Sequence, residues 1–274
     1  MLLATVLALT AAVLHAGWNL AIKQGGDRFL ALWGQFTLAG AIGLVIILAV
    51  GGFPSHGWWW AALSGTIHVP YCWFLARAYD HGDFSLVYPM ARGGGALLAA
   101  IGGLTLLDDH ISHIGIGAIV LVALGLFLLA GKARGPELWA ALAVAATIGA
   151  YSVSDAKGIR STDNALYALA TFVGTGTMTT AFGLATGRAA AMRTAMRINW
   201  RRYLVLGIAS SFTYGLVQLA FRRAPVGYVT ALRESSVVIA AFAGSRVLGE
   251  SAGRRRMVAS GVVVAGLITL VVAR

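Results

Sequence analysis

Three charged residues lie inside segments that are otherwise apolar enough to cross a lipid bilayer. Arg92 lies in the segment 84–107, and Arg233 and Glu234 lie in the segment 226–247. An ionised arginine near the bilayer centre costs about 2.5–3.5 kcal/mol, so it persists only where it faces protein, water or a ligand. The guanidinium fork binds carboxylates and phosphates through two parallel hydrogen bonds. Two arginines with one carboxylate predict a site for an amino acid or a related small organic anion. The alternative is a buried ion network that holds two parts of the chain together.

Further polar residues recur at the spacing of a helix face. His15, Trp18 and Asn19 occupy positions i, i+3 and i+4, which lie on one side of a helix. Similar polar faces occur in later segments, and we expect them to line one central cavity. The predicted substrate-binding residues are Arg92, Arg233, Tyr88, His15, Trp18, Asn19, His68, Tyr71, Tyr151, Tyr214 and Gln218.

Three residues are candidates for carrying a proton, namely Glu234, His15 and Asp155. Histidine is included because it is the side chain that ordinarily changes charge near neutral pH. The polar residues also have structural interpretations, since amides commonly join helices in membranes and tyrosines commonly belong to the core. For Asp155, which is close to Lys157, the alternative is a solvated carboxylate at the end of its helix.

The composition indicates an integral membrane protein. Of 274 residues, 58% are hydrophobic and 11% are charged, against about 25% charged residues in ordinary soluble domains, and the mean hydropathy is +0.79. The net charge is +11, but the basic residues fall mainly in short gaps between apolar runs, as membrane anchors do. Nucleic-acid binding is therefore not expected. The single cysteine, Cys72, offers neither a disulfide framework nor a thiolate metal site.

Apolar runs of about 20 residues, the length that spans a bilayer, occur about ten times. They lie near residues 2–22, 29–50, 57–79, 84–107, 113–130, 137–157, 164–186, 201–222, 226–247 and 254–273. Short connections leave little chain for a soluble domain. Pro89 is expected to kink or interrupt its helix, whereas Pro225 is expected to begin one. The glycines 93–95 are expected to let their span approach a neighbour closely.

The two halves of the chain show weak internal similarity. A shift of 142 residues places Asp108 opposite Glu250 and Arg92 opposite Glu234. The halves, 1–131 and 136–274, then hold about five spans each, and an odd number inserts the second half upside down relative to the first. We therefore expect an all-α integral membrane protein of about ten transmembrane helices, arranged as two inverted five-helix repeats.

Short patterns carry a resemblance to a known family. They are the stretch His15 to Asn19 followed by Lys23, and the acidic residues that close the fourth span of each half, Asp108 and Glu250. In these patterns and in its repeats, the chain resembles an EamA-type member of the drug/metabolite transporter superfamily. The resemblance covers essentially the whole chain. It implies a ten-helix fold of two inverted halves, and a multi-pass protein that moves small polar metabolites across the bacterial inner membrane.

The predicted function is secondary transport of a small polar metabolite by alternating access, in the direction of export, with proton coupling as a candidate. The alternative is an uncoupled facilitator or exchanger of another metabolite or a drug-like amine. The expected partners are the substrate, membrane lipids and protons, without a cofactor or a metal. We expect a monomer, with a dimer as the alternative. No His-Glu-x-x-His motif occurs in the sequence, and we do not expect an enzyme.

The orientation of the chain follows from its basic residues. Lysines and arginines are more numerous in the connections on the side opposite the termini. The positive-inside rule therefore predicts both termini outside, whereas the family resemblance implies cytoplasmic termini.

Overall fold

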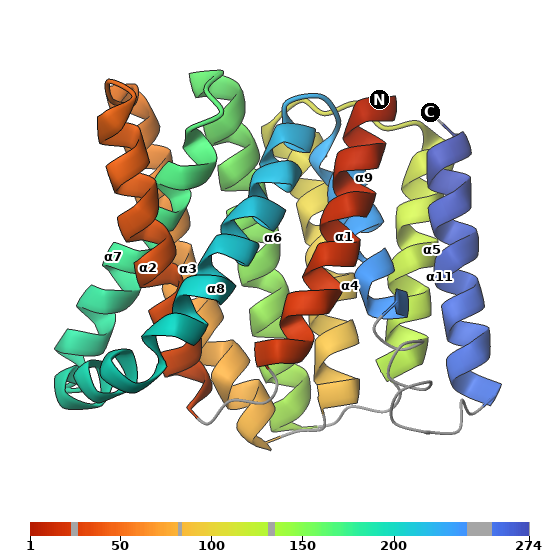
Figure 1. The fold of residues 1–274 in the computed structure, drawn as a ribbon. Helices are drawn as coiled ribbons and strands as arrows, with labels where there is room; N and C mark the ends of the chain where they lie inside the picture. The colour runs from red at the N-terminus through yellow and green to blue at the C-terminus, as the bar shows by residue number, and fades with distance from the viewer. Residues whose placement is uncertain (23–26, 82–83, 131–134, 240–253, 274) are drawn as a thin grey trace.

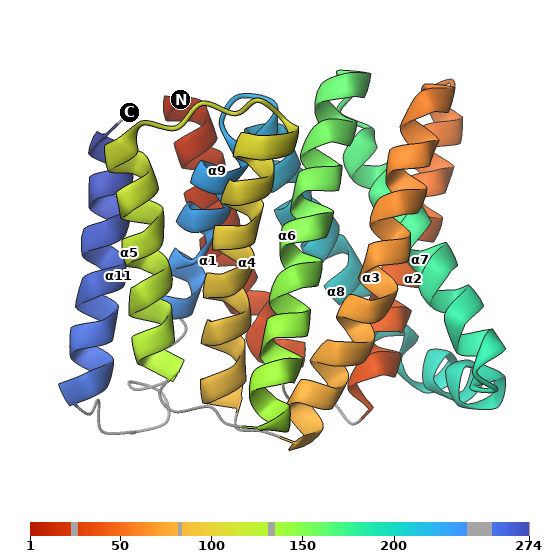
Figure 2. The same cartoon turned by 180° about the vertical axis from the view of Figure 1, so that it is seen from behind.

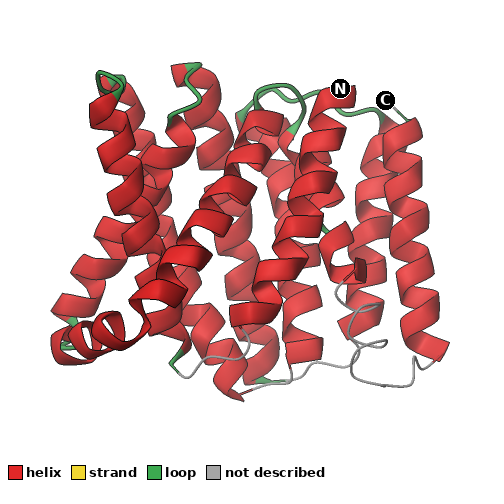
Figure 3. Cartoon of the chain, viewed as in Figure 1, coloured by secondary structure: helices red, strands yellow, loops and turns green. Residues whose placement is uncertain are grey.

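The structure is a computed structural model that describes residues 1–22, 27–81, 84–130, 135–239 and 254–273. Every regular element in these ranges is a helix (Figure 3). The helices are α1 (Leu2–Ile22), α2 (Arg28–Ala49), α3 (Ser55–His81), α4 (Phe84–Leu106), α5 (His113–Ala130), α6 (Pro136–Thr162), α7 (Tyr167–Ala185), α8 (Ala189–Phe221), α9 (Val226–Arg233) and α11 (Arg254–Val272).

The predicted all-α fold is confirmed, and two helices extend beyond the predicted spans. α6 continues to Thr162 and ends at Asp163, whose backbone is left-handed with φ 46°. α8 begins at Ala189, twelve residues before the predicted start. The predictions followed the apolar runs, but alanine, arginine and methionine are strong helix formers even where the sequence is polar. Loss of apolarity therefore did not mark the ends of these helices.

The ninth predicted span, 226–247, is interrupted. α9 ends at Arg233, a turn follows at Glu234, and residues 235–239 are helical again. The amide of Glu234 donates to the carbonyl of Ala231, a short-range bond that tightens the last turn. The remainder of this predicted span, from residue 240 on, lies outside the described residues. The break thus coincides with the two charged residues.

Prolines and glycines shape the helices differently from one another. Pro89 was predicted to kink or interrupt its helix; α4 runs continuously through it, so an interruption there is wrong. Pro225 caps the start of α9, as predicted. A Cβ on Gly95 would lie only 2.5 Å from the side chain of Ile148 in α6, which confirms the close approach expected of this glycine.

The helices lie side by side, with both termini at one end (Figures 1 and 2). α5 packs against α11 at one edge of the molecule, and α2 packs against α7 near the other. Between these edges α4 packs against α6, α3 packs against α6 and α7, and α1 packs against α8 and α9. α9 therefore lies among α1, α4 and α5, close to the middle of the bundle.

The outer surface is apolar where it would meet lipid. Four of the described helices are long and apolar enough to cross a membrane, namely α2, α7, α8 and the part of α6 from Leu138. Large apolar side chains such as Val45, Val205 and Phe212 are more than half exposed on this surface. An apolar exterior of this kind suits a hydrocarbon environment better than water.

The crossing of α3 and α7 predicts a stability effect. A Cβ on Gly174 would lie 2.2 Å from the carbonyl oxygen of Ala61, a backbone atom that cannot swing aside. We therefore expect Gly174→Ala to lower the free energy of unfolding by about 1–3 kcal/mol. Gly117→Ala in α5 is the matched control, because no atom lies within 4 Å of its added Cβ. Thermal unfolding in detergent checks this, and equal melting temperatures for the two variants would contradict it.

Candidate functional site

A cavity of about 60 Å³ lies where α1, α2, α3, α6, α7, α8 and α9 meet. It holds a few water molecules at most, well below the roughly 300–1,000 Å³ of typical ligand pockets. A metabolite therefore needs the surrounding helices to separate before it can enter. Six of the predicted substrate-binding residues line the cavity: His15, His68, Tyr71, Tyr151, Tyr214 and Arg233.

The sequence-based prediction missed the contribution of α2 and α7. Phe36 of α2 lines the cavity, as do Thr171, Phe172 and Thr175 of α7. Ser210 and Thr213 of α8 also line the cavity, and neither was among the predicted substrate-binding residues. A signal was present for α7, because Thr171 and Thr175 are four residues apart and share one helix face. For Phe36 there was none, since a phenylalanine in an apolar span is ordinary.

Aromatic rings form one wall of the cavity around His68. The His68 ring stacks on Tyr151 with centroids 4.4 Å apart, and Tyr71 contacts it edge-on at 5.7 Å. Nδ1 of His68 lies 2.8 Å from the carbonyl oxygen of Ser64, one turn earlier in α3. A carbonyl only accepts, so Nδ1 carries a proton and donates it there. In the neutral ring, Nε2 is then an acceptor.

Arg233 is the charged residue that lines the cavity. Its side chain is 5% exposed, and its guanidinium lies 5.5 Å from the ring centre of Tyr214, a cation–π contact. No carboxylate among the described residues forms an ion pair with it. The burial of a cation is ordinarily compensated by an anion or by several hydrogen bonds. Arg233 therefore brings a guanidinium to the cavity wall that forms no direct ion pair within the described part of the chain.

Arg92 and Glu234 are joined in a buried ion pair. Nε of Arg92 lies 3.0 Å from Oε2 of Glu234, and Nη2 lies 2.9 Å from Oε1, so the contact is bidentate. Their side chains are 5% and 2% exposed, and neither residue lines the cavity. This contact links α4 to the residue that ends α9. The ion network considered as an alternative describes these two residues, whereas Arg233 stays outside it.

Asp155 is fully buried, so its interpretation as a solvated carboxylate at a helix end is wrong. The hydroxyl of Tyr214 donates to its Oδ2 at 2.5 Å, and that of Tyr167 donates to its Oδ1 at 3.3 Å. α6 extends well past Asp155, which places the carboxylate inside the bundle. Asp155 does not line the cavity but holds Tyr214, which does. Tyr214 thus contacts an anion through its hydroxyl and a cation through its ring.

The other predicted residues are less informative. Gln218 is buried behind the cavity, where its Nε2 donates to the Thr171 hydroxyl at 3.1 Å. The side chains of Trp18, Asn19 and Tyr88 lie outside what the structure describes, as do Lys23 and Glu250. Asp108 is an exposed residue with φ 54° just beyond α4, which agrees with a structural end.

Comparisons with known proteins place these features in context. The model of the EamA-like transporter family matches residues 135–272. No curated protein matches the chain. A crystal structure of another protein superposes with a TM-score of 0.74 at 18% sequence identity, covering 99% of each chain. At that identity the likeness concerns the fold alone.

The Arg92–Glu234 pair predicts a large cost when one partner is removed. Arg92→Met leaves a buried carboxylate without its partner, and we expect a loss of about 3–5 kcal/mol in the free energy of unfolding. The double variant Arg92→Met/Glu234→Leu should recover most of that loss, because no charge is then stranded. Arg222→Gln is the control, since its partner Asp163 is 80% exposed and exposed pairs contribute about 0–1 kcal/mol. Equal losses for Arg92→Met and Arg222→Gln in chemical unfolding would exclude a structural role for the buried pair.

Proposed function

The chain belongs to the EamA-like transporter family, and we propose that it is a carrier for a small metabolite that bears a carboxylate. This family of membrane transporters falls within the drug/metabolite transporter superfamily. The proposed substrate is an amino acid or a related small organic anion. It moves by alternating access, in the direction of export, across a bacterial inner membrane that the chain crosses several times.

The observation that carries this proposal is the guanidinium of Arg233 at the cavity wall, which has no direct ion pair among the residues that the structure describes. Arg92 is neutralised by Glu234 across a bidentate contact, so the remaining guanidinium is the one available to a ligand at the cavity. A carboxylate fits its planar fork through two hydrogen bonds, and a phosphate has the same geometry. A drug-like amine is the less favoured alternative, because Arg233 would repel it.

The remaining cavity wall suits a polar molecule with an apolar part. Thr175, Ser210 and Thr213 contribute hydroxyl-bearing side chains to the wall, and Phe172 and Tyr151 contribute aromatic rings. Aromatic faces also attract an ammonium group. An amino acid would therefore place its carboxylate at Arg233 and its ammonium group among the aromatic rings.

The helix packing supports the inverted repeat that alternating access requires. In the repeat, α3 corresponds to α8, and α6 and α7 correspond to α1 and α2. α3 packs against α6 and α7, and α8 packs in the same way against α1 and α2. α2 with α7, α4 with α9 and α5 with α11 are contacts between counterparts. Arg92 and Glu234, paired by the 142-residue shift, touch one another. A two-fold axis between two halves produces contacts of this kind.

Ligand binding tests the role of Arg233. A panel of amino acids and organic acids is screened by thermal shift on the purified protein, since a ligand at 100 times its Kd adds about 2.7 kcal/mol of stability. We expect a carboxylate-bearing compound to raise the melting temperature and to drive counterflow in proteoliposomes. Arg233→Gln should abolish both effects, whereas Arg223→Gln, at an exposed arginine of the α8–α9 turn, should preserve them. A compound that binds Arg233→Gln as tightly as the native protein would refute the carboxylate site.

Proton coupling is the second part of the proposal, with His15 as the proton carrier. Of the three candidates it is the one that lines the cavity, while Glu234 is held by Arg92 and Asp155 by two tyrosines. We expect an imposed pH gradient to accelerate net transport in proteoliposomes several-fold. His15→Gln should lose this acceleration but keep counterflow, and His113→Gln, which is exposed, is the control. A transport rate indifferent to the gradient would remove coupling from the proposal.

A further inference from the structure

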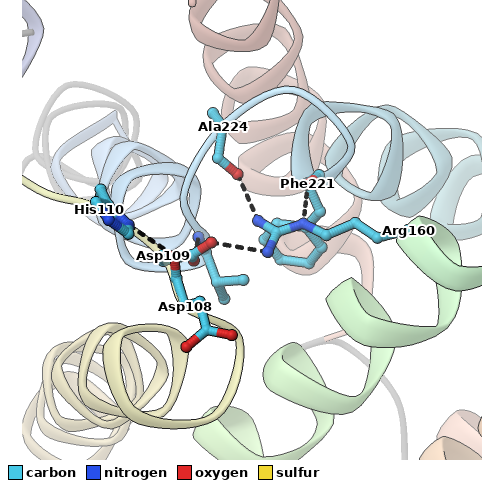
Figure 4. Close-up of polar contacts among 7 residues, drawn as sticks. Asp108, Asp109, His110, Arg160, Phe221 and Ala224 are labelled. Atoms are coloured by element: carbon cyan, nitrogen blue, oxygen red, sulfur yellow. Dashed lines mark hydrogen bonds and ion pairs between the residues drawn. The ribbon is translucent and has the colours of Figure 1, made fainter.

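A cluster of polar contacts joins three segments at the end of the molecule where the termini lie (Figures 1 and 4). Asp109 follows α4 and accepts two hydrogen bonds. Nη1 of Arg160, from the last turn of α6, lies 2.7 Å from its Oδ1, and the amide of Val226 lies 2.6 Å from its Oδ2. Nearby, the Ser112 hydroxyl donates to the carbonyl of Ala273, which places this cluster beside the C-terminal end.

Arg160 binds the turn between α8 and α9 as well as Asp109. Its Nε lies 2.7 Å from the carbonyl oxygen of Phe221, and its Nη2 lies 2.9 Å from that of Ala224 (Figure 4). Phe221 ends α8, and Val226 begins α9. The C-terminal end of a helix has carbonyl groups without partners and a partial negative charge, so a cation suits the end of α8. The N-terminal end has amide groups without partners and a partial positive charge, so an anion suits the start of α9. The pair of Asp109 and Arg160, which we name the clasp, satisfies both.

The clasp fixes the position of α9. This helix has eight residues, all buried, and is therefore about 12 Å long. Its first residue is held by Asp109, and its last residue is Arg233 at the cavity wall. A short rigid helix transmits a displacement from one end to the other. Movement of Val226 would therefore move the guanidinium of Arg233.

The clasp differs from the other charged contact of α9 in how much water reaches it. The side chain of Arg160 is 25% exposed and that of Asp109 is 7% exposed, against 5% and 2% for Arg92 and Glu234. Water already reaches the Arg160 side chain, so its charge can be solvated when the clasp separates. Separation of Arg92 from Glu234 would strand two buried charges at a much larger cost. The Asp109–Arg160 contact is therefore suited to reversible separation, whereas the Arg92–Glu234 contact is suited to staying intact.

We infer that Asp109 and Arg160 are positioning residues that hold α9 and Arg233 in place and close the path from the terminus side to the cavity. Release of the clasp accompanies opening to that side. This inference rests on the proposed carrier function for the role of Arg233 as the ligand-binding group. The closure itself is measurable without any substrate.

The test measures access to the cavity with a membrane-impermeant thiol reagent. The reporter is Thr213→Cys, at the cavity wall, with Cys72→Ser as background. The reagent is applied to each side of the membrane separately, and Leu2→Cys, an exposed residue near the N-terminus, identifies the terminus side. We expect Asp109→Asn and Arg160→Gln each to accelerate labelling from that side about tenfold, equivalent to about 1.4 kcal/mol lost from the closed form. Melting temperatures of all variants show whether they fold.

Three comparisons separate a closure from a merely structural contact. The double variant Asp109→Asn/Arg160→Gln should exceed neither single variant, because both remove the same interaction. Asp109→Glu retains the carboxylate and should restore slow labelling. Asp163→Asn is the matched control, since Asp163 pairs with Arg222 outside the clasp. If Asp109→Asn does not fold, Arg160→Lys, which keeps the charge but loses the fork, takes its place.

The inference is overturned if the clasp variants label at the native rate. It is also overturned if they label faster from both sides alike, or if Asp163→Asn labels as fast as they do. Faster labelling from the terminus side in a protein that binds no carboxylate ligand would support the clasp and refute the carboxylate carrier. The two proposals therefore fail independently.

Discussion

The constraint on which the structure depends is the cost of placing charge inside an apolar bundle. Arg92 and Glu234 meet this cost by pairing across two hydrogen bonds, with almost no exposure to solvent. Glu234 directly follows Arg233, so the same contact that neutralises Arg92 fixes the end of α9. Glu234 pairs with Arg92 in this way, and Arg233 lies at the cavity wall. The positive charge of the proposed site is thus a consequence of how the buried charges are shared.

Tyr214 connects the two signs of charge around the cavity. Its hydroxyl donates to Asp155, and its ring lies beneath the guanidinium of Arg233. A side chain held at both ends has little freedom, so the cation and the anion keep a fixed relation through one ring. Asp155 does not line the cavity, and its hydrogen bond to Tyr214 connects it to a residue that does. Its effect on a ligand or a proton would therefore pass through the Tyr214 hydroxyl.

The small volume of the cavity means that the proposed mechanism must include an opening step. About 60 Å³ of space admits water but not a metabolite, so the structure is a form that cannot yet hold the proposed substrate. On the terminus side the proposed clasp provides the closure through charges that water can reach. Arg92 and Glu234, at the other end of α9, stay paired when Asp109 and Arg160 separate. α9 would then tilt and carry Arg233 with it while Glu234 stays paired with Arg92, so that no buried charge is stranded.

The sequence alone determined the class of the molecule and most of its helices. Apolar runs of bilayer length fix where helices must form, because an unpaired backbone cannot exist in hydrocarbon. Charges inside those runs marked Arg92, Arg233 and Glu234 as residues that must face protein, water or ligand, and helical spacing found much of the cavity wall. Helix ends were less accessible, as in α6 and α8, since polar residues with high helix propensity continue a helix beyond its apolar part.

Only the tertiary structure decided which of these groups are partners. Arg92 pairs with Glu234 because α4 packs against α9, although the two residues are 142 positions apart in the chain. Asp155 is buried rather than solvated because tyrosines from α7 and α8 reach it. The clasp joins Asp109 to residues 51 and 117 positions away. Hydropathy and periodicity report the surroundings of one segment, whereas the pairing of charges depends on which distant segments pack side by side.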